Sequence, residues 1–310
     1  MVPVYILTGF IDAGKTTAAR DLIYSMQQAD YKKTLLLVCE QGEEEYDYQG
    51  LKDIGVTLKY IENESDMEDD LILDLELEVR PERIIVEYNG MWNLDRPKVI
   101  WDPEQILEIM LIDTSTFDMY LGNLKAMIAD KIRSADLIIF GRCEGSEDKL
   151  SMYRRSARAL NRNANIVFRN EDGEISFDPG AHLPYDADAD VIEIDDDSYA
   201  AFYIDSMEDP DRYVGKKVKF SGIVLNSKKN GEHSFIVGRI AITCCSEDMT
   251  VFGFICDTEE ENPYITDEWV DVTCVMKKEY SEKYEIWHPV CKVKSLRPSS
   301  EEHKKVINVT

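Results

Sequence analysis

Basic residues, cysteines and long apolar runs are all scarce in this 310-residue sequence. Lys and Arg number 35 against 61 Asp and Glu, which gives a formal net charge of -26. The electrostatic field of a protein with this negative charge repels phosphate backbones and anionic lipid surfaces, so no nucleic-acid partner is expected. No apolar run approaches the ~18 residues that cross a bilayer, and the start, MVPVYILTGF, lacks a secretory signal. We therefore expect a cytoplasmic protein without a membrane span.

The seven cysteines are an odd number in a sequence without an export signal. Disulfides persist mainly in oxidising compartments, so these residues are expected to be reduced thiols. The length fits two domains, and a hydrophobic content of 44% allows both to fold around a core.

The first part of the chain alternates between short β-branched runs and helix-like stretches. This alternation predicts an α/β domain over residues 1–170, with a mostly parallel sheet covered by helices. The expected strands are Val4–Leu7, Thr34–Cys39, Arg83–Glu87, Ile109–Asp113, Leu137–Phe140 and Asn165–Phe168, and the clearest helices are Thr16–Met26 and Ser151–Leu160.

The second part differs in composition. Residues 171–187 are acidic, contain proline and glycine, and are predicted to be a linker. Over residues 188–310 a short helix, Tyr199–Met207, precedes strand-like runs with no long helix between them. This pattern predicts a small all-β domain, an antiparallel barrel of the OB type, with a tight turn at Asn230-Gly231. The expected strands are Lys217–Leu225, Ser234–Cys244, Thr250–Cys256, Trp269–Met276 and Tyr284–Leu296.

The stretch GFIDAGKTT follows the first expected strand and opens the first expected helix. Its spacing, G-x-x-x-x-G-K-T, is that of a P-loop, whose main-chain N–H groups bind phosphate at a helix N-terminus. Lys15 would bridge the β- and γ-phosphates, and the Thr16 hydroxyl would bind Mg²⁺. The alternative is a strand-to-helix turn that contains a lysine by chance. The preceding strand, the spacing of the motif and the following helix all favour the P-loop instead. The residues expected to hold the nucleotide here are Gly9, Asp12, Ala13, Gly14, Lys15, Thr16 and Thr17.

With this loop, residues 1–170 resemble the CobW-type GTPases, a metal-associated branch of the P-loop proteins whose loop reads GFLGAGKTT. Two further stretches, VCEQGEEEYD and IIVEYNG, resemble that family's magnesium segments. The resemblance implies GTP and Mg²⁺, with Glu40 and Glu87 near the metal and the Gly90 N–H at the γ-phosphate. Taken alone, Glu40 would be a solvated loop residue. Glu87 ends an apolar strand beside the phosphate loop, a position that itself favours function.

The base-reading segment departs from the family. The family has N-K-x-D where this chain has Gly141, Arg142 and Glu144. Glu144 can still accept hydrogen bonds from guanine and the Arg142 stem can still cover the base, but one contact is lost, so the choice between guanine and adenine stays open. The resemblance also places Asn161 beside the base. Asp113, which ends a strand, is either a nucleotide contact or a helix N-cap.

A second departure concerns metal. CobW-type proteins carry C-x-C-C between the first two nucleotide segments, whereas the corresponding YIENESDMEDD contains no cysteine. The family's thiolate site cannot exist there, so a transfer chaperone that works through that site cannot work the same way.

From about residue 188 the chain resembles the soluble C-terminal domain of the YcgQ type, usually part of membrane proteins paired with a permease. The matching features are Tyr213-Val214-Gly215-Lys216, Gly222, Arg239 and Cys244-Cys245-x-x-Asp248. Cys244, Cys245 and Asp248 form a candidate soft-metal site, with zinc the first candidate. His288 and three further cysteines are candidate additional ligands, but each lies in a strand-like apolar run and free cysteine is commonly buried, so burial in the core is favoured for most of them. These cysteines are Cys256, Cys274 and Cys291.

The leading hypothesis is a Mg²⁺-dependent GTPase of slow intrinsic turnover, with Lys15, Thr16 and Glu87 as catalytic residues. It would couple nucleotide state to metal homeostasis through a metal cargo, a client metalloprotein or a permease, as a possible homodimer. The rival is a nucleotide-gated binding module in which the small barrel captures a metal or protein and hydrolysis is incidental. A nucleotide kinase or ATPase is disfavoured because no basic lid segment is seen.

Overall fold

The computed structural model describes residues 1–25, 33–42, 45–176, 178–226, 233–243, 249–259, 263–299, 303 and 306–309. The chain forms two compact units, one of Met1–Leu150 with Leu160–Phe177 and one of Ser151–Ala159 with Asp178–Thr310. This division differs from the linker expected over residues 171–187. Part of that stretch belongs to the first unit and part to the second, and most of helix α7 (Leu150–Leu160) belongs to the second unit.

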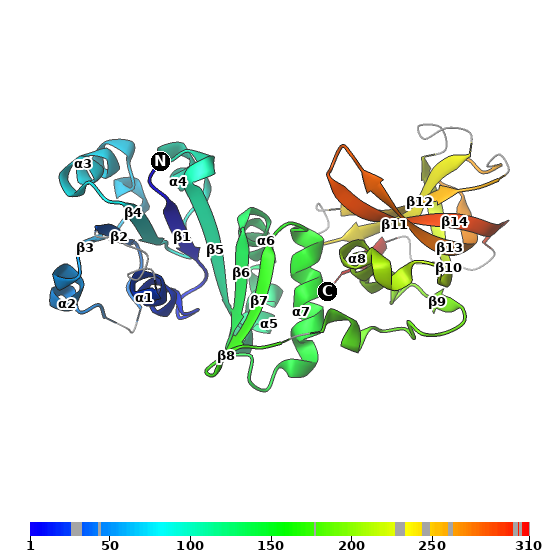
Figure 1. Cartoon of the computed structure of the whole chain (residues 1–310), viewed down its shortest axis with the longest axis horizontal. Helices are drawn as coiled ribbons and strands as arrows, with labels where there is room; N and C mark the ends of the chain where they lie inside the picture. Colours follow the sequence, from blue (N-terminus) through cyan, green and yellow to red (C-terminus); the bar gives the residue numbers. More distant parts are fainter. Residues whose placement is uncertain are drawn as a thin grey trace. The chain divides into compact units, whose positions relative to one another are not determined.

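The first unit is built on an eight-stranded sheet in the order β3-β2-β4-β1-β5-β6-β7-β8 (Figure 1). Its strands are parallel except β8, which pairs antiparallel with β7. Every strand expected here is present, and the parallel α/β prediction is confirmed. The short edge strands β3 and β8 were not predicted. The strands are β1 (Val4–Thr8), β2 (Thr34–Val38), β3 (Val56–Tyr60), β4 (Arg83–Glu87), β5 (Ile106–Asp113), β6 (Leu137–Gly141), β7 (Asn165–Asn170) and β8 (Gly173–Glu174).

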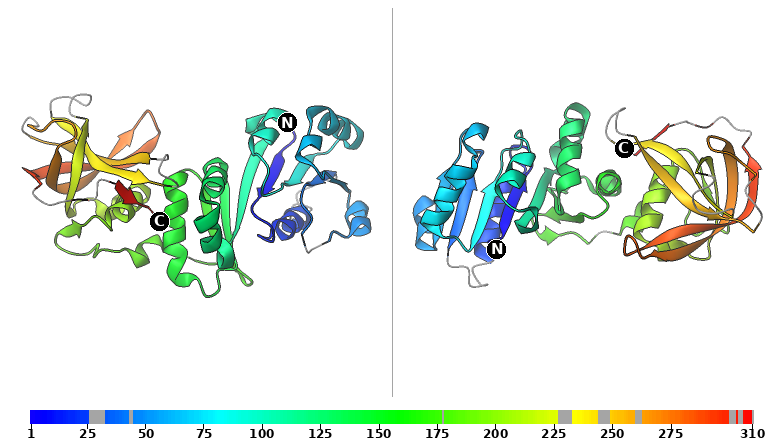
Figure 2. Two further views of the ribbon diagram at one scale, coloured as in Figure 1. Left: turned by 180° about the vertical axis from the view of Figure 1, so that it is seen from behind. Right: turned by 90° about the horizontal axis from the view of Figure 1, so that it is seen from above.

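Helices cover both faces of this sheet, as Figures 1 and 2 show. Alternate side chains of a strand point to opposite faces, so the sheet has an apolar core on each side. Ala19 and Ile23 of α1 pack into one core, and Ile72 and Leu75 of α3 pack into the other. The helices are α1 (Lys15–Ser25), α2 (Tyr48–Asp53), α3 (Asp69–Val79), α4 (Asp95–Ile100), α5 (Thr114–Asn123) and α6 (Lys125–Ser134).

The second unit is a closed barrel. Its sheet has the order β15-β11-β12-β14-β13-β10-β9, and β10 also pairs with β11, which closes a ring of five strands (Figure 2). This ring confirms the OB-like prediction. One pair within it, β12 with β14, is parallel. The elements are β9 (Ile192–Ile194), α8 (Tyr199–Glu208), β10 (Lys217–Asn226), β11 (Ser234–Ile242), β12 (Met249–Asp257), β13 (Trp269–Ser281), β14 (Ile286–Pro298) and β15 (Val306–Asn308).

Helix α8 is buried along most of its length. Residues 199–206 are all buried, and its aromatic side chains join the core formed by the barrel strands. The Phe202 ring packs 5.2 Å from Phe254, and the Tyr203 ring stacks 4.5 Å from Phe252. This helix contacts strands β12, β14 and β15, so α8 packs against the barrel and completes one core with it.

Candidate nucleotide-binding site

The phosphate loop connects the carboxyl end of β1 to α1, which begins at Lys15. Its backbone turns through positive φ angles at Gly9 (139°), Asp12 (60°) and Gly14 (93°). A Cβ on Gly9 would lie 2.4 Å from the Leu111 carbonyl oxygen, so only glycine fits there. The N–H groups at the start of a helix have no intrahelical acceptor. At the start of α1 they lie at the carboxyl edge of the sheet, where they can bind an anion.

Lys15 is buried within the loop that it serves. Its Nζ donates hydrogen bonds of 2.9 Å to the carbonyl oxygens of Gly9 and Phe10. The same atom lies 2.5 Å from Glu40 Oε2, yet that oxygen is buried and makes no hydrogen bond of normal geometry within the described chain. The ammonium group is therefore fixed at the loop, facing a carboxylate whose bonding is incomplete.

Thr16 and Glu87 meet directly, although 71 residues separate them. The Thr16 hydroxyl donates to Glu87 Oε1 at 2.6 Å, and the Tyr46 hydroxyl donates to Glu87 Oε2 at 2.6 Å. Burial raises the pKa of Glu87, while the two hydroxyl groups and Lys15 act to lower it. Burial and the Glu87 charge raise the pKa of Tyr46, so its hydroxyl stays a proton donor. The expected pair Thr16 and Glu87 is brought together, and Tyr46 is a neighbour that the sequence did not indicate.

Gly90 lies directly against the phosphate loop. A Cβ at this position would be 2.3 Å from the Gly9 carbonyl oxygen and 3.0 Å from Phe10 Cα. The segment after β4 thus depends on a residue without a side chain at this position, while the expected contact of the Gly90 N–H with the γ-phosphate stays a prediction.

Arg142 extends from the end of β6 to the phosphate loop. Its Nη1 donates to the Asp12 carbonyl oxygen at 2.9 Å and pairs with Asp113 Oδ2. Asp113 is also the N-cap of α5, since Oδ1 accepts from the Ser115 N–H at 2.9 Å. The N-cap alternative for Asp113 is therefore present in the structure, together with an ion pair at the site.

The remaining base-reading residues have different surroundings. Glu144 is exposed and its Oε1 accepts from the Glu171 N–H at 2.9 Å, which holds the carboxylate near the end of β6. Asn161 does not reach the site. Its amide donates at 2.8 Å to the carbonyl oxygens of Ile132 and Ala135, which lie before β6 at the opposite edge of the sheet. Asn161 thus joins loops at the amino edge, and its expected place beside the base is corrected.

A cavity of about 110 Å³ opens at this edge of the sheet. Main-chain N–H donors and an ammonium group suit a polyphosphate, and a hydroxyl with carboxylates suits a hard cation such as Mg²⁺. The residues present therefore fit a magnesium–nucleotide complex. The lining residues are Ile11, Asp12, Gly14, Lys15, Thr16, Thr17, Glu40, Gly42, Glu87 and Arg142.

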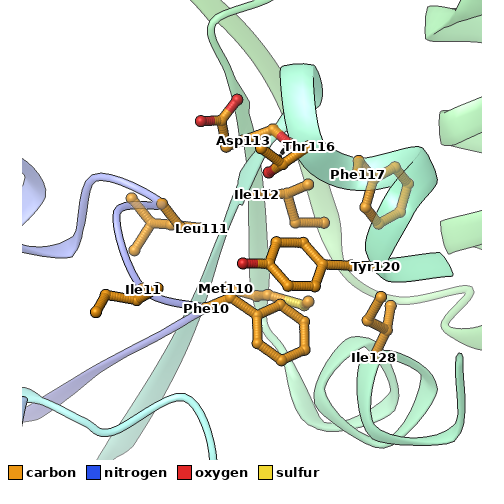
Figure 3. Close-up of a pocket in the computed structure, with 11 residues that line it drawn as sticks. Phe10, Ile11, Met110, Leu111, Ile112, Asp113, Thr116, Phe117, Tyr120 and Ile128 are labelled. Atoms are coloured by element: carbon orange, nitrogen blue, oxygen red, sulfur yellow. Dashed lines mark hydrogen bonds between the residues drawn. The ribbon is translucent and has the colours of Figure 1, made fainter. Parts of the chain in front are cut away.

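A second hollow, beside the first half of the loop, is apolar and holds only about 10 Å³ (Figure 3). The Phe10 and Tyr120 rings stack there, with centroids 4.3 Å apart and planes 13° apart. A space of this size holds one water at most. We interpret it as packing that fixes Phe10, and with it the loop, against α5.

The soft-metal prediction at Cys244, Cys245 and Asp248 lies outside the described residues, as does the turn at Asn230-Gly231. It stays a prediction. Cys256, Cys274 and Cys291 are fully buried in the core, as the sequence favoured, whereas His288 is half-buried. Within the described chain, no group of three or more His, Cys, Asp or Glu is arranged to hold a metal ion. The buried free cysteines are Cys39, Cys143, Cys256, Cys274 and Cys291.

The parallel sheet and this loop define a P-loop nucleotide-binding domain. The family model for the CobW/HypB/UreG nucleotide-binding domain matches residues 3–168, and the chain belongs to this family of P-loop GTPases. The DUF1980 C-terminal domain model matches residues 181–307, which confirms the fusion expected from the sequence. None of the described helices has the length and hydropathy to span a bilayer.

Among curated proteins, none matches the chain significantly. Among solved structures, the HypB hydrogenase maturation factor of Archaeoglobus fulgidus is 16% identical over 55% of this chain and 82% of its own, with a TM-score of 0.43. HypB of Helicobacter pylori, solved with nickel, is 17% identical over 57% and 80%, with a TM-score of 0.33. Similarity this distant does not indicate a shared ligand.

Proposed function

We propose that this chain is a cytoplasmic, Mg²⁺-dependent GTPase of slow intrinsic turnover, whose nucleotide state is coupled to a metal-related partner. One observation supports the proposal above all. Lys15, Thr16, Glu40 and Glu87 come from three separate stretches of sequence and line one cavity at the mouth of a P-loop. These groups must lie together if they are to bind the phosphates, hold Mg²⁺ and orient water beside the ion.

In this mechanism the main-chain N–H groups of the loop bind the phosphate oxygens, and Lys15 stabilises the charge that develops between the β- and γ-phosphates. To do so, Lys15 exchanges contacts with the Gly9 and Phe10 carbonyl oxygens for contacts with phosphate. Thr16 and Glu40 would hold Mg²⁺, and Glu87 would orient water beside it. The bound ion would supply charge neutralisation at the phosphates.

We propose slow turnover because the acidic groups in the cavity already have partners. Glu40 pairs with Lys15, and Glu87 accepts from Thr16 and Tyr46. Of the described residues that line the cavity, the one further carboxylate is Asp12, which belongs to the phosphate loop itself, and we assign it no role in activating an attacking water. A partner or a second copy of the chain would therefore be needed for fast hydrolysis.

Base selection should be weaker than in a complete N-K-x-D motif. Gly141 offers no side chain to the base, so guanine is distinguished chiefly through Glu144. We expect GTP to be preferred over ATP, by a smaller margin than an asparagine at 141 would give.

The metal-related task is proposed from family membership. It cannot use thiolates in the segment Tyr60–Asp70, which contains no cysteine. A cargo ion, a client metalloprotein or a permease would therefore have to be recognised elsewhere on the chain.

The test is phosphate release from GTP and from ATP, with Mg²⁺ and with EDTA. Wild type should hydrolyse GTP slowly and only with Mg²⁺. In Lys15→Ala the rate of phosphate release should fall by at least about 100-fold, which is the scale of one lost electrostatic contact in the transition state. Lys52→Ala, an exposed lysine on α2, is the matched control and should behave as wild type. Equal rates of phosphate release for wild type and Lys15→Ala would exclude nucleotide hydrolysis at this site. Rapid phosphate release by the wild-type monomer would contradict slow turnover.

A further inference from the structure

Tyr46 lies between β2 and α2, near the end of the stretch VCEQGEEEYD, where the family resemblance assigns it no role, yet it reaches the centre of the site. Its hydroxyl donates to Glu87 Oε2 at 2.6 Å, while Glu87 Oε1 accepts from Thr16 at 2.6 Å. Glu87 is only 3% exposed. Each oxygen of this buried carboxylate thus has one hydroxyl donor, and the Tyr46 bond fixes the rotation that aims Oε1 at Thr16.

The Tyr46 side chain is itself held firmly from helix α1. The Arg20 guanidinium lies 5.5 Å from the centre of the Tyr46 ring, and Arg20 Nη2 donates to the Glu45 carbonyl oxygen at 2.6 Å. On the other side, Asp47 caps α2 by accepting from the Gly50 N–H at 3.0 Å. The segment is therefore anchored on both sides of Tyr46, and its first anchor is the helix that carries Lys15 and Thr16.

The consequence concerns the Thr16 oxygen. A hydroxyl has one proton to donate and two lone pairs. When the proton is given to Glu87 Oε1, the lone pairs of Thr16 are left for a cation in the cavity. If the Glu87 carboxylate rotated freely, the Thr16 hydroxyl could turn as well, and its lone pairs would no longer be directed to the cation in advance.

We propose that Tyr46 is a positioning residue for the Mg²⁺ site: by holding Glu87 it keeps the Thr16 oxygen directed to the cation. This inference rests on the proposed function, since it concerns the magnesium that accompanies the nucleotide. A merely structural tyrosine would affect nucleotide binding equally with and without Mg²⁺.

The experiment compares wild type, Tyr46→Phe and Tyr48→Phe. Phenylalanine keeps the ring and its contact with Arg20 and removes only the hydroxyl. Tyr48, two residues further on and 59% exposed, provides the matched control. GDP affinity is measured by calorimetry with Mg²⁺ and with EDTA, and melting temperatures are recorded for each protein.

Wild type and Tyr48→Phe should bind GDP more tightly with Mg²⁺ than with EDTA. For Tyr46→Phe, the ratio of GDP affinity with Mg²⁺ to that with EDTA should be about tenfold smaller than for wild type, which is the scale of one hydrogen bond to a charged group. Its affinity in EDTA should stay within about twofold of wild type. The Mg²⁺ concentration for half-maximal phosphate release should rise by a similar factor, with little change in the saturating rate.

An unchanged Mg²⁺ gain in Tyr46→Phe would overturn the inference. So would an equal loss of affinity in Mg²⁺ and in EDTA, because that result assigns Tyr46 to the fold alone. If wild type showed no Mg²⁺-dependent gain, the proposed function itself would fail, and this inference with it. The three results are distinguishable because the wild-type protein is measured in both buffers.

Discussion

Replacing Gly90 by alanine should displace the phosphate loop without touching any charged group of the site. The new Cβ would lie 2.3 Å from the Gly9 carbonyl oxygen, about 1 Å closer than ordinary contact, and 3.0 Å from Phe10 Cα. Both neighbours are main-chain atoms, which cannot rotate away as a flexible side chain can. The loop and the segment after β4 must therefore separate.

The cost can be estimated from this geometry. Overpacking in a tightly packed region costs about 1–3 kcal/mol, so the free energy of unfolding should fall by that amount. A displacement of about 1 Å among groups that position a substrate costs on the order of 100-fold in rate. We expect GTP affinity and phosphate release to fall by at least about tenfold.

Gly122→Ala in α5 is the matched control. A Cβ at Gly122 meets nothing within 4 Å, and alanine favours a helix over glycine by up to about 1 kcal/mol. Urea denaturation gives the stability of each variant, and calorimetry gives its affinity for GTP. If Gly90→Ala and Gly122→Ala both behaved as wild type, the close packing of Gly90 on the phosphate loop would be refuted.

Two further predictions concern Arg142 and Lys131. Arg142→Ala removes the bond to the Asp12 carbonyl oxygen and should weaken GTP binding by about threefold to tenfold, because the half-exposed arginine is partly screened by solvent; calorimetry that found full affinity would show that this contact does not support the loop. Lys131 is buried, and burial lowers its pKa from 10.5 to about 8, so folding favours the neutral amine and charged Lys131 costs stability below pH 8. Lys131→Met should therefore raise the free energy of unfolding by roughly 3 kcal/mol at pH 7, and this gain should shrink towards zero as the pH approaches 10.5. Denaturation curves at both pH values check the sign, and a gain that grew with pH would contradict it.

Sequence reasoning predicted the parts of the site that are local in the chain. Gly9, Gly14, Lys15 and Thr16 follow one another within a strand, a turn and a helix start, so their spacing alone encodes the geometry. Glu87 was predicted because it ends an apolar strand. In a parallel sheet such ends meet at one edge, which is how residues far apart in sequence could be placed together.

Residues whose role depends on a distant contact gave no such signal. Tyr46 is one aromatic residue in an acidic stretch, and its contact with Glu87 spans 41 residues. Asn161 was placed by resemblance beside the base, yet it follows α7 and precedes β7, which puts it at the amino edge. Edge strands β3 and β8 were missed because short, half-exposed strands lack a long apolar run.

The packing of α8 bears on how the second unit can recognise a ligand or partner. Rings from this helix and from the barrel strands pack together in one buried core. These side chains are committed to the fold, so we expect recognition to use the outer strand faces or the loops at the rims. Substitutions that abolish partner capture while sparing the fold should therefore be found among solvent-facing positions of this unit.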